Sequence, residues 1–318
     1  MTSSDCDNGE IMKTTTPIYA VDVKGNYILV GGKDENAAVY TVDNGDLITI
    51  VADLEESVMF CKMLDDHDVL YLVVTNDGLI CLMKLDQSVE ITKRNEAITT
   101  CKYTGGELLI GTETGQIHVL SKELLVTTTL SWNTPIKEVE KINNYIFGLV
   151  ENALIVGDVY GNIETVYDVH GIQCFQCINK NIIAIGTNTK FLIYCGKKLL
   201  FELDTEAVET IAIWKHICIL GGGFNGLKII NMNNYSHYTI LMENIYVRMI
   251  KYVCEFVVIY ITYDNFVGVM DIRDKMTLRL LDPELGDIYD IAYELNMQII
   301  NIVVGGEYGY KHFVINIP

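Results

Sequence analysis

The sequence predicts an all-β protein built from repeated four-stranded antiparallel sheets. The first observation is the segment at residues 31–51, in which two short apolar strands flank the turn DNGD. Alternating β-branched residues around an Asn-Gly turn are the strongest short-range hairpin signal. The second observation is that similar segments return roughly every 35 to 45 residues, the period of a propeller blade. The third is that no window sustains the apolar period of a helix. Together they predict a single β-propeller.

Four apolar runs separated by turn residues place each blade. The first four blades are expected to have strands at residues 18–23, 27–30, 37–42 and 47–51; 58–64, 69–75, 79–85 and 89–93; 98–103, 108–112, 116–121 and 125–130; and 136–142, 145–150, 153–157 and 163–169. The fourth blade is the least regular. A seven-bladed alternative would require it to merge with its neighbour.

The pattern continues to the end of the chain, where one strand is missing. The later blades are expected to have strands at residues 172–178, 182–187, 191–195 and 199–203; 208–214, 217–221, 227–232 and 238–242; 247–253, 256–262, 266–272 and 278–281; and 288–293, 299–304 and 311–315. A strand at 10–15 is expected to complete the last blade on the outer edge of 311–315, because this leaves no open sheet edge. The sequence thus predicts eight four-stranded blades over residues 10–318, after a flexible segment at 1–9.

Charge narrows the class of partner. The chain has 42 Asp and Glu against 23 Lys and Arg, a formal net charge of −19. A protein that binds a nucleic-acid backbone or an anionic membrane needs cations on the surface that faces it. We therefore expect neither partner, and the acidity serves either solubility or a basic protein. The longest apolar run, residues 256–261, is also far too short to span a bilayer.

The N-terminus and the cysteines indicate the compartment. The first ten residues are polar and acidic, without the charged and apolar regions of a signal peptide. Nine cysteines, scattered through strand-like segments, are typical of buried thiols in a reducing compartment. We expect a cytoplasmic protein, and the sequence leaves entry into the nucleus open.

Motifs for catalysis, cofactors and metals are weak. The segment GGGFNG at residues 221–226 fits G-x-G-x-x-G, but a strand follows it, so an inter-strand turn is expected instead of a dinucleotide site. Cys174 and Cys177 form C-x-x-C without a second pair, and their odd separation places them on opposite faces of a strand. The six histidines show no metal or triad spacing. The prediction is no enzyme, no cofactor and no metal; a catalytic site assembled at the channel mouth is the third hypothesis.

Carboxylates concentrate on one predicted rim. In a propeller this rim carries the links between blades and the turns between each blade's second and third strands. Its few cations are Lys33, Lys93, Arg94 and Lys190, whereas the other rim is mixed. An acidic rim would attract and orient a cationic partner, although charged loops also serve solvation alone. The candidate partner-binding residues are Asp34, Glu35, Asp53, Glu55, Glu56, Asp77, Glu113, Glu151, Asp204, Glu206, Asp264, Asp282, Glu284, Asp287 and Glu307.

Several segments resemble WD repeats. GTETGQIHVLS (residues 111–121) and VGVMDIRDKMTLRLLD (residues 267–282) resemble the third-strand signature of the repeat. GGKDENAAVYTVDNGDLI and the following VADLEESVMFCKM are similar to the opening blade of the angio-associated migratory cell protein (AAMP) family, which includes a fungal ribosome-assembly chaperone. The resemblance implies an eight-bladed propeller. It also implies an acidic face that binds the basic N-terminal segment of a newly made large-subunit ribosomal protein.

The chain departs from the repeat signature at its polar positions. Tyr40, Met83 and Met270 stand where tryptophan is usual, and Ala52-Asp53 replaces the Gly-His dipeptide of the first link. Most of the hydrogen-bond network of the repeat is therefore missing, and close packing is expected to stabilise the blades instead.

The sequence as a whole predicts a monomeric, non-enzymatic chaperone that holds a basic ribosomal protein on its acidic rim. The alternative is a structural subunit of a stable complex, such as a translation-initiation or coat assembly. Salt separates the two, because a charge-steered complex weakens as ionic strength rises and an apolar interface does not.

Overall fold

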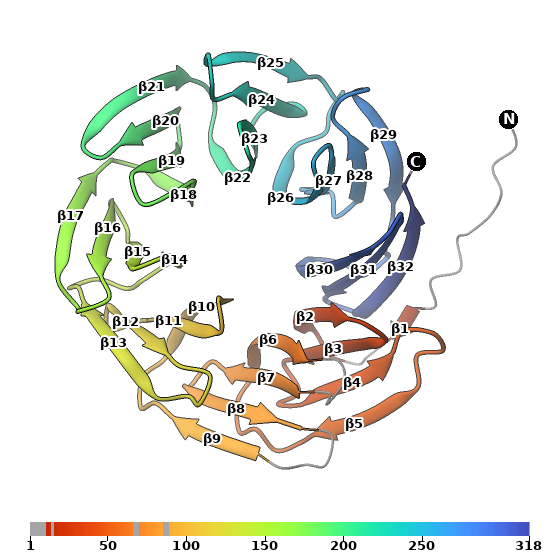
Figure 1. The fold of residues 1–318 in the computed structure, drawn as a ribbon. Coiled ribbons are helices and arrows are strands. Elements are labelled where there is room, and N and C mark those ends of the chain that lie inside the picture. The colour runs from red at the N-terminus through yellow and green to blue at the C-terminus, as the bar shows by residue number, and fades with distance from the viewer. Residues whose placement is uncertain (1–10, 14–15, 66–69, 85–88, 318) are drawn as a thin grey trace, which may run out of the picture. The chain divides into compact units, whose positions relative to one another are not determined.

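The protein is an eight-bladed β-propeller of four-stranded antiparallel sheets (Figure 1). The computed structural model describes residues 11–13, 16–65, 70–84 and 89–317, and within these it contains 32 strands and no helix. No segment of these ranges could therefore cross a membrane as a helix. The predicted flexible segment 1–9 lies outside the described residues. Contacts divide the chain into two compact units, residues 1–98 with 283–318, and residues 99–282.

Three blades belong to the first unit. Blade 1 contains β2 (Ile18–Lys24), β3 (Tyr27–Gly32), β4 (Ala37–Thr41) and β5 (Leu47–Val51); blade 2 contains β6 (Val58–Asp65), β7 (Leu70–Thr75), β8 (Leu79–Met83) and β9 (Val89–Lys93); blade 8 contains β30 (Ile288–Asn296), β31 (Ile299–Gly306), β32 (Gly309–Asn316) and β1 (Ile11–Lys13). Each sheet runs in chain order except blade 8, whose outermost strand is β1.

Five blades belong to the second unit. Blade 3 contains β10 (Ile98–Thr104), β11 (Glu107–Thr112), β12 (Gln116–Leu120) and β13 (Val126–Ser131); blade 4 contains β14 (Glu138–Ile142), β15 (Tyr145–Leu149), β16 (Ala153–Asp158) and β17 (Ile163–Asp168); blade 5 contains β18 (Ile172–Cys177), β19 (Ile182–Thr187), β20 (Lys190–Cys195) and β21 (Lys198–Asp204); blade 6 contains β22 (Val208–Trp214), β23 (Ile217–Gly222), β24 (Leu227–Asn231) and β25 (Ser236–Ile240); blade 7 contains β26 (Val247–Cys254), β27 (Val257–Thr262), β28 (Val267–Asp271) and β29 (Met276–Leu281).

The predicted closure by the N-terminal strand is confirmed. β1 pairs with β32 antiparallel, with Ile11 opposite Lys311 and Lys13 opposite Gly309. The last sheet would otherwise have three strands and an open edge. Eight separate four-stranded sheets also exclude the seven-bladed alternative.

Most predicted strands agree with the observed ones to within two residues, and the largest difference is in blade 8. There β30 continues through Asn296 and β31 through Gly306, beyond the predicted ends at 293 and 304. The apolar pattern stops at Tyr293, but Glu294 still pairs with Asn301. The hairpin extends because the backbone pairing continues to Asn296 opposite Ile299, and Leu295 lies opposite the buried Ile300.

The hydrophobic cores lie between neighbouring blades. One cluster joins Leu29 and Val39 of blade 1 to Val58 and Val73 of blade 2, and another joins Val30 of blade 1 to blade 8. Middle strands are buried on both faces, as in β27, whereas the outer strands β5 and β13 are partly exposed. Each blade therefore depends on its neighbours to bury its apolar faces.

The first strand of several blades contains a β-bulge at its second residue. In blade 1 the register shifts between Ile18 and Ala20, and in blade 8 between Ile288 and Asp290, so Tyr19 and Tyr289 have no opposite partner. A bulge bends the strand and redirects its extra side chain. These two tyrosines are therefore turned out of the regular alternation.

Candidate protein-binding site

One end of each blade carries both the turn between its second and third strands and the link to the next blade. We call it the link end, and the other the hairpin end. Backbone hydrogen bonds join turns to links in the first unit: the Leu54 amide donates to the Glu35 carbonyl at 3.1 Å, and the Glu307 amide to the Asp287 carbonyl at 2.9 Å. The topological basis of the predicted rim thus holds within each unit, because the turns and links lie side by side.

The first unit brings nine of the predicted carboxylates to its link ends. All but the half-buried Asp77 and Glu307 are exposed. Glu35, Asp53, Glu55 and Glu284 have positive φ angles of 55° to 68°, so the tight turns are built at the acidic residues themselves. The nine residues lie in the turns and links of blades 8, 1 and 2: Asp34, Glu35, Asp53, Glu55, Glu56, Asp77, Glu284, Asp287 and Glu307.

The second unit carries the remaining six more sparsely. Each is exposed, and no link end in this unit holds more than two of them. They lie in turns, in links or at the last residue of a strand: Glu113, Glu151, Asp204, Glu206, Asp264 and Asp282. The acidic character predicted for the whole rim is therefore densest in the first unit.

A lysine of the same unit forms ion pairs with two of the predicted carboxylates. Lys93 Nζ lies 3.2 Å from a Glu55 oxygen and 3.1 Å from an Asp77 oxygen. Burial opposes ionisation of Asp77, but hydrogen bonds from Thr75 and Lys93, with the lysine charge, lower the pKa of this carboxyl overall. Asp77 is thus engaged within the fold and is less available to a partner.

Two carboxylates of the second unit are paired in the same way. Lys228 Nζ lies 3.1 Å from a Glu206 oxygen and 4.1 Å from the ring centre of Phe224. Lys190 lies 3.8 Å from an Asp204 oxygen. Lys190 was predicted on this rim, but Lys228 was not, because Lys228 lies within β24 and its side chain extends to the turn.

Of the nine residues of the first unit, four exposed carboxylates have no lysine or arginine partner among the described residues: Asp34, Glu35, Asp53 and Glu56. They flank the turn of blade 1 and the link to blade 2. Because they are exposed and unpaired, they create a negative potential open to solvent, which a cationic segment could neutralise.

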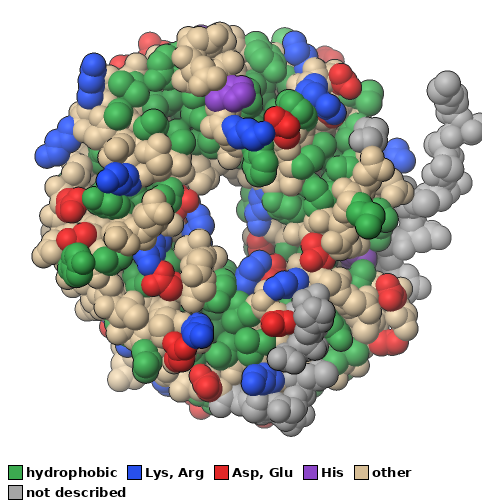
Figure 2. All heavy atoms as spheres, viewed as in Figure 1, with side chains coloured by type: hydrophobic (Ala, Val, Ile, Leu, Met, Phe, Trp, Pro, Cys, Tyr) green, Lys and Arg blue, Asp and Glu red, His purple; other side chains and the backbone are tan. Residues whose placement is uncertain are grey.

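Figure 2 shows one face of the molecule with its side chains coloured by type. There Lys and Arg side chains lie among Asp and Glu side chains, with hydrophobic side chains between them. At the hairpin ends of blades 6 and 7 a cavity of about 200 Å³ is mostly apolar. Arg273 at its edge bonds Asp271 through Nη2 at 2.6 Å and lies over the ring of Phe256 at 4.5 Å. Its lining residues are Ile217, Ile229, Asn231, Ser236, Tyr238, Phe256, Ile272 and Arg273.

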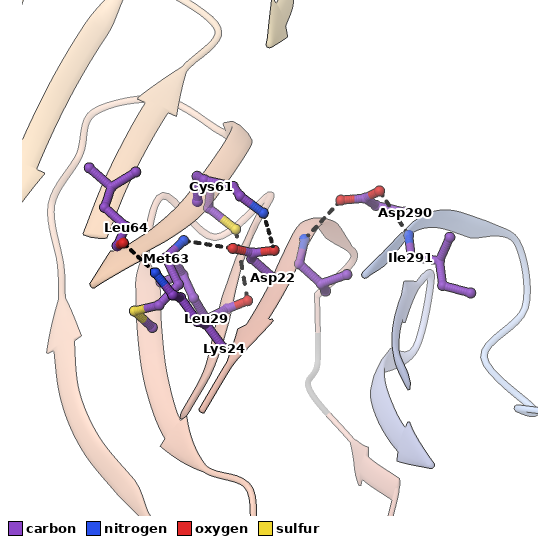
Figure 3. Close-up of polar contacts among 10 residues, drawn as sticks. Asp22, Lys24, Leu29, Cys61, Met63, Leu64, Asp290 and Ile291 are labelled. Atoms are coloured by element: carbon purple, nitrogen blue, oxygen red, sulfur yellow. Dashed lines mark hydrogen bonds and ion pairs between the residues drawn. The ribbon is translucent and has the colours of Figure 1, made fainter. Parts of the chain in front are cut away.

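Polar contacts between first strands join the blades, and the sequence analysis did not foresee them. Figure 3 shows Asp22 of β2 facing β6, where its carboxylate accepts the Met63 amide at 2.7 Å and binds Lys62 Nζ at 2.7 Å. Asp290 of β30 accepts the Val21 amide at 3.1 Å. The expectation that close packing alone replaces the repeat's hydrogen-bond network is therefore incomplete, since carboxylates also link neighbouring blades.

A carboxylate also links blade 4 to blade 5. Glu140, almost fully buried on β14, accepts the Cys177 amide at 3.1 Å and approaches Lys102 Nζ at 3.3 Å. Two residues earlier, Glu138 bonds the Phe175 amide. Burial raises the pKa of Glu138 to about 7, although the Lys102 charge opposes this. The sequence signal for these residues is weak, because β14 (EVEKI) alternates charged and apolar residues as many half-exposed strands do.

The cysteine pair and the glycine-rich segment weighed for metal and cofactor binding lie in the sheets of blades 5 and 6. Cys174 and Cys177 are free thiols that pack into different clusters, as their odd spacing predicts. Residues 221–226 comprise the end of β23 and the turn that leads into β24, so the segment lacks the helix that a dinucleotide site requires. In the part of the chain that the structure describes, no three His, Cys, Asp or Glu side chains could hold a metal ion.

The fold and its acidic link ends define a propeller whose exposed chemistry suits protein binding. The model of the WD40-like domain matches residues 16–313, and the chain therefore belongs to the WD40-like domain family. The comparison with curated proteins found no match.

Solved structures similar to this chain share the propeller at low sequence identity. Sqt1 of Saccharomyces cerevisiae is 11% identical with a TM-score of 0.81, and the match covers 98% of both chains. Chaetomium thermophilum Sqt1, bound to the N-terminus of the ribosomal protein L10, is 12% identical with a TM-score of 0.78, covering 95% of this chain and 97% of that one. The computationally designed Ika8 protein is 15% identical with a TM-score of 0.79, covering 96% and 98%. A designed protein fits as well as a natural one, so these matches show the fold alone.

Proposed function

We propose that this propeller is a non-enzymatic chaperone that binds the basic N-terminal segment of a large-subunit ribosomal protein. The observation that carries the proposal is the group of exposed carboxylates in the first unit, Asp34, Glu35, Asp53 and Glu56. Charge pairing with Lys and Arg would hold the segment there. The protein would act as a monomer in the cytoplasm, and the proposal also allows it to enter the nucleus.

Two likenesses support the choice of client. One is the similarity to the Sqt1 structure with the N-terminus of the ribosomal protein L10 bound, in which the match covers 95% of this chain and 97% of that one. The other is the similarity of the first blade and its link to the AAMP family, which includes a fungal ribosome-assembly chaperone. The acidic link residues Asp53, Glu55 and Glu56 lie within the segments that carry this similarity.

A structural subunit of a stable complex is the second candidate. The observation that favours it is the outer strand of blade 1, where Leu47 and Ile50 are 53% and 51% exposed. Exposed apolar residues on an outer strand suit a permanent apolar interface. Such an interface would strengthen or stay constant with salt, unlike the complex we propose.

The test is titration calorimetry with a synthetic peptide of the L10 N-terminal segment. The double variant Asp34→Lys/Glu56→Lys changes the net charge by four at the link end, where both side chains are exposed. Each reversal removes an attraction and adds a repulsion of about 0.2–1 kcal/mol, so we expect affinity to fall about fivefold to a hundredfold.

A matched control changes the same charge at the hairpin end of blade 1. Asp43 and Asp46 are also exposed, so Asp43→Lys/Asp46→Lys alters the net charge equally without touching the link end. We expect the affinity of this control to stay within about threefold of that of the unsubstituted protein. The substituted charges lie at the opposite end of the blade from the link end, and salt screens exposed charges over such a separation. Equal losses in both variants, or no binding by the unsubstituted protein, would refute the proposal.

A further inference from the structure

Three tyrosines gather at the link ends of blades 8 and 1, in the first unit. Tyr19 of β2 and Tyr289 of β30 are the bulged residues of their strands, and their ring centres lie 5.1 Å apart, edge to face. Tyr308 follows in the turn between β31 and β32. Tyr289 is 40% exposed and Tyr308 54% exposed. Aromatic surface is thus presented to solvent at a place where neither burial nor strand pairing requires it.

The backbone fixes two carboxylates beside these rings. The Glu307 and Tyr308 amides donate to the carbonyls of Asp287 and Leu285, at 2.9 and 3.0 Å, so the turn is tied to the link. Gly286, at a φ of 66°, lets the two approach: a Cβ there would lie 2.5 Å from Glu307 Oε2 and 2.9 Å from Tyr308 Cε2. Asp287, Glu307 and the rings therefore form one preorganised cluster.

The electrostatics of the cluster are those of a cation site. The Glu307 charge raises the pKa of the Tyr308 phenol, and burial followed by the charges of Glu307 and Asp287 raises the pKa of Tyr289. The charges of both carboxylates thus act on both phenols. A cation placed against the ring faces would gain from the π-electrons and from the carboxylates together.

We propose that Tyr19, Tyr289, Tyr308, Asp287 and Glu307 form a subsite that receives one arginine side chain of a basic segment. The inference rests on the proposed function for its client but is tested independently of it. Arginine fits better than lysine because its planar guanidinium stacks on an aromatic ring while its N–H fork bonds a carboxylate. The subsite would fix the register of a segment that charge alone would bind in many registers.

The test compares hexa-arginine with hexa-lysine, which carry the same charge, by titration calorimetry on the full chain. We expect hexa-arginine to bind about three- to tenfold more tightly, because arginine gains one cation–π contact with an aromatic ring and one N–H fork to a carboxylate. Tyr289→Leu/Tyr308→Leu keeps every charge and should reduce this preference to below about twofold. Tyr308→Leu alone should reduce it in part, and serves if the double variant does not fold.

The matched control is Tyr160→Leu, which removes an 85% exposed tyrosine from the hairpin end of blade 4. This variant should keep the full preference for arginine. Equal affinities for the two peptides, or a preference that survives Tyr289→Leu/Tyr308→Leu, overturns the subsite. If the L10 peptide does not bind while the arginine preference follows these variants, the subsite stands and only the named client is wrong.

Discussion

Carboxylates have two different roles in this protein, and the burial of each side chain distinguishes the two roles. Asp22, Glu140 and Asp290 accept backbone amides of the neighbouring blade, and the first two are also paired with lysine. A buried carboxylate that lost these donors would be costly, so these residues stabilise the joints between blades. Asp34 and Glu56 are exposed and have no lysine or arginine partner in the described part of the chain, which leaves their charge for a ligand.

Glu138 makes one of these joints dependent on pH. Burial raises the pKa of Glu138 to about 7, above the ordinary value near 4.5. Between these two pH values the folded protein keeps a proton on Glu138 that the unfolded chain has released. The stabilising contribution is complete below about pH 4.5 and is lost as the pH rises through 7. Three groups act on the Glu138 carboxyl. Glu140 lies on the same strand, Lys102 lies on β10 of blade 3, and the Phe175 amide lies on β18 of blade 5.

We therefore expect Glu138→Gln to differ from the unsubstituted protein in a pH-dependent way. Since Glu138 is partly exposed, the expected gain is about 1–2 kcal/mol in the free energy of unfolding at pH 8, with little difference at pH 5. Urea unfolding at both pH values measures it. Glu151→Gln, which removes an exposed carboxyl of the same blade, should show no such dependence. A constant difference between the pH values for Glu138→Gln would contradict the assignment.

At the scale of elements, the sequence located strands well because turns separate them. Asn44 and Gly45 mark the β4–β5 hairpin, and the shortage of strands after residue 288 was enough to place β1. The joints between blades could not be predicted in the same way. Asp22 and Met63 are far apart in sequence, and which amide a carboxylate reaches depends on the packing of two sheets.

The candidate site was predictable in part for the same reason. Alternation of strand direction assigns every turn to one end of its blade, which the structure bears out within each unit. The pairing of Glu206 by Lys228 was hidden, since a lysine within a strand can still extend its amine to the turn. The tyrosine cluster was hidden because a bulge shifts the alternation of side chains at Tyr19 and Tyr289.

The three-residue strand β1 carries a prediction of its own. Removing residues 1–15 deletes the partner of Gly309 to Lys311 and leaves β32 as an open edge. We expect the melting temperature to fall by about 2–8 °C and the protein to self-associate, because an exposed edge offers unpaired backbone groups. Calorimetry and light scattering measure the two effects. Removing residues 1–9 spares β1 and should change neither; a monomeric 1–15 deletion of unchanged stability would mean that β1 does not protect the edge.

At the scale of the whole molecule, the net charge of −19 acts on stability and on binding with opposite signs. Like charges repel within the folded chain, so raising the salt from 50 to 500 mM should raise the melting temperature by a few degrees, on the order of 2–5 °C. The same screening should weaken binding of the L10 peptide by about tenfold or more, because attraction to the exposed carboxylates is lost. Differential scanning calorimetry and peptide titration at both salt concentrations measure the pair. Opposite responses identify an acidic surface that recruits its partner. A rise in stability without loss of affinity would instead assign the carboxylates to solubility and favour a permanent apolar interface.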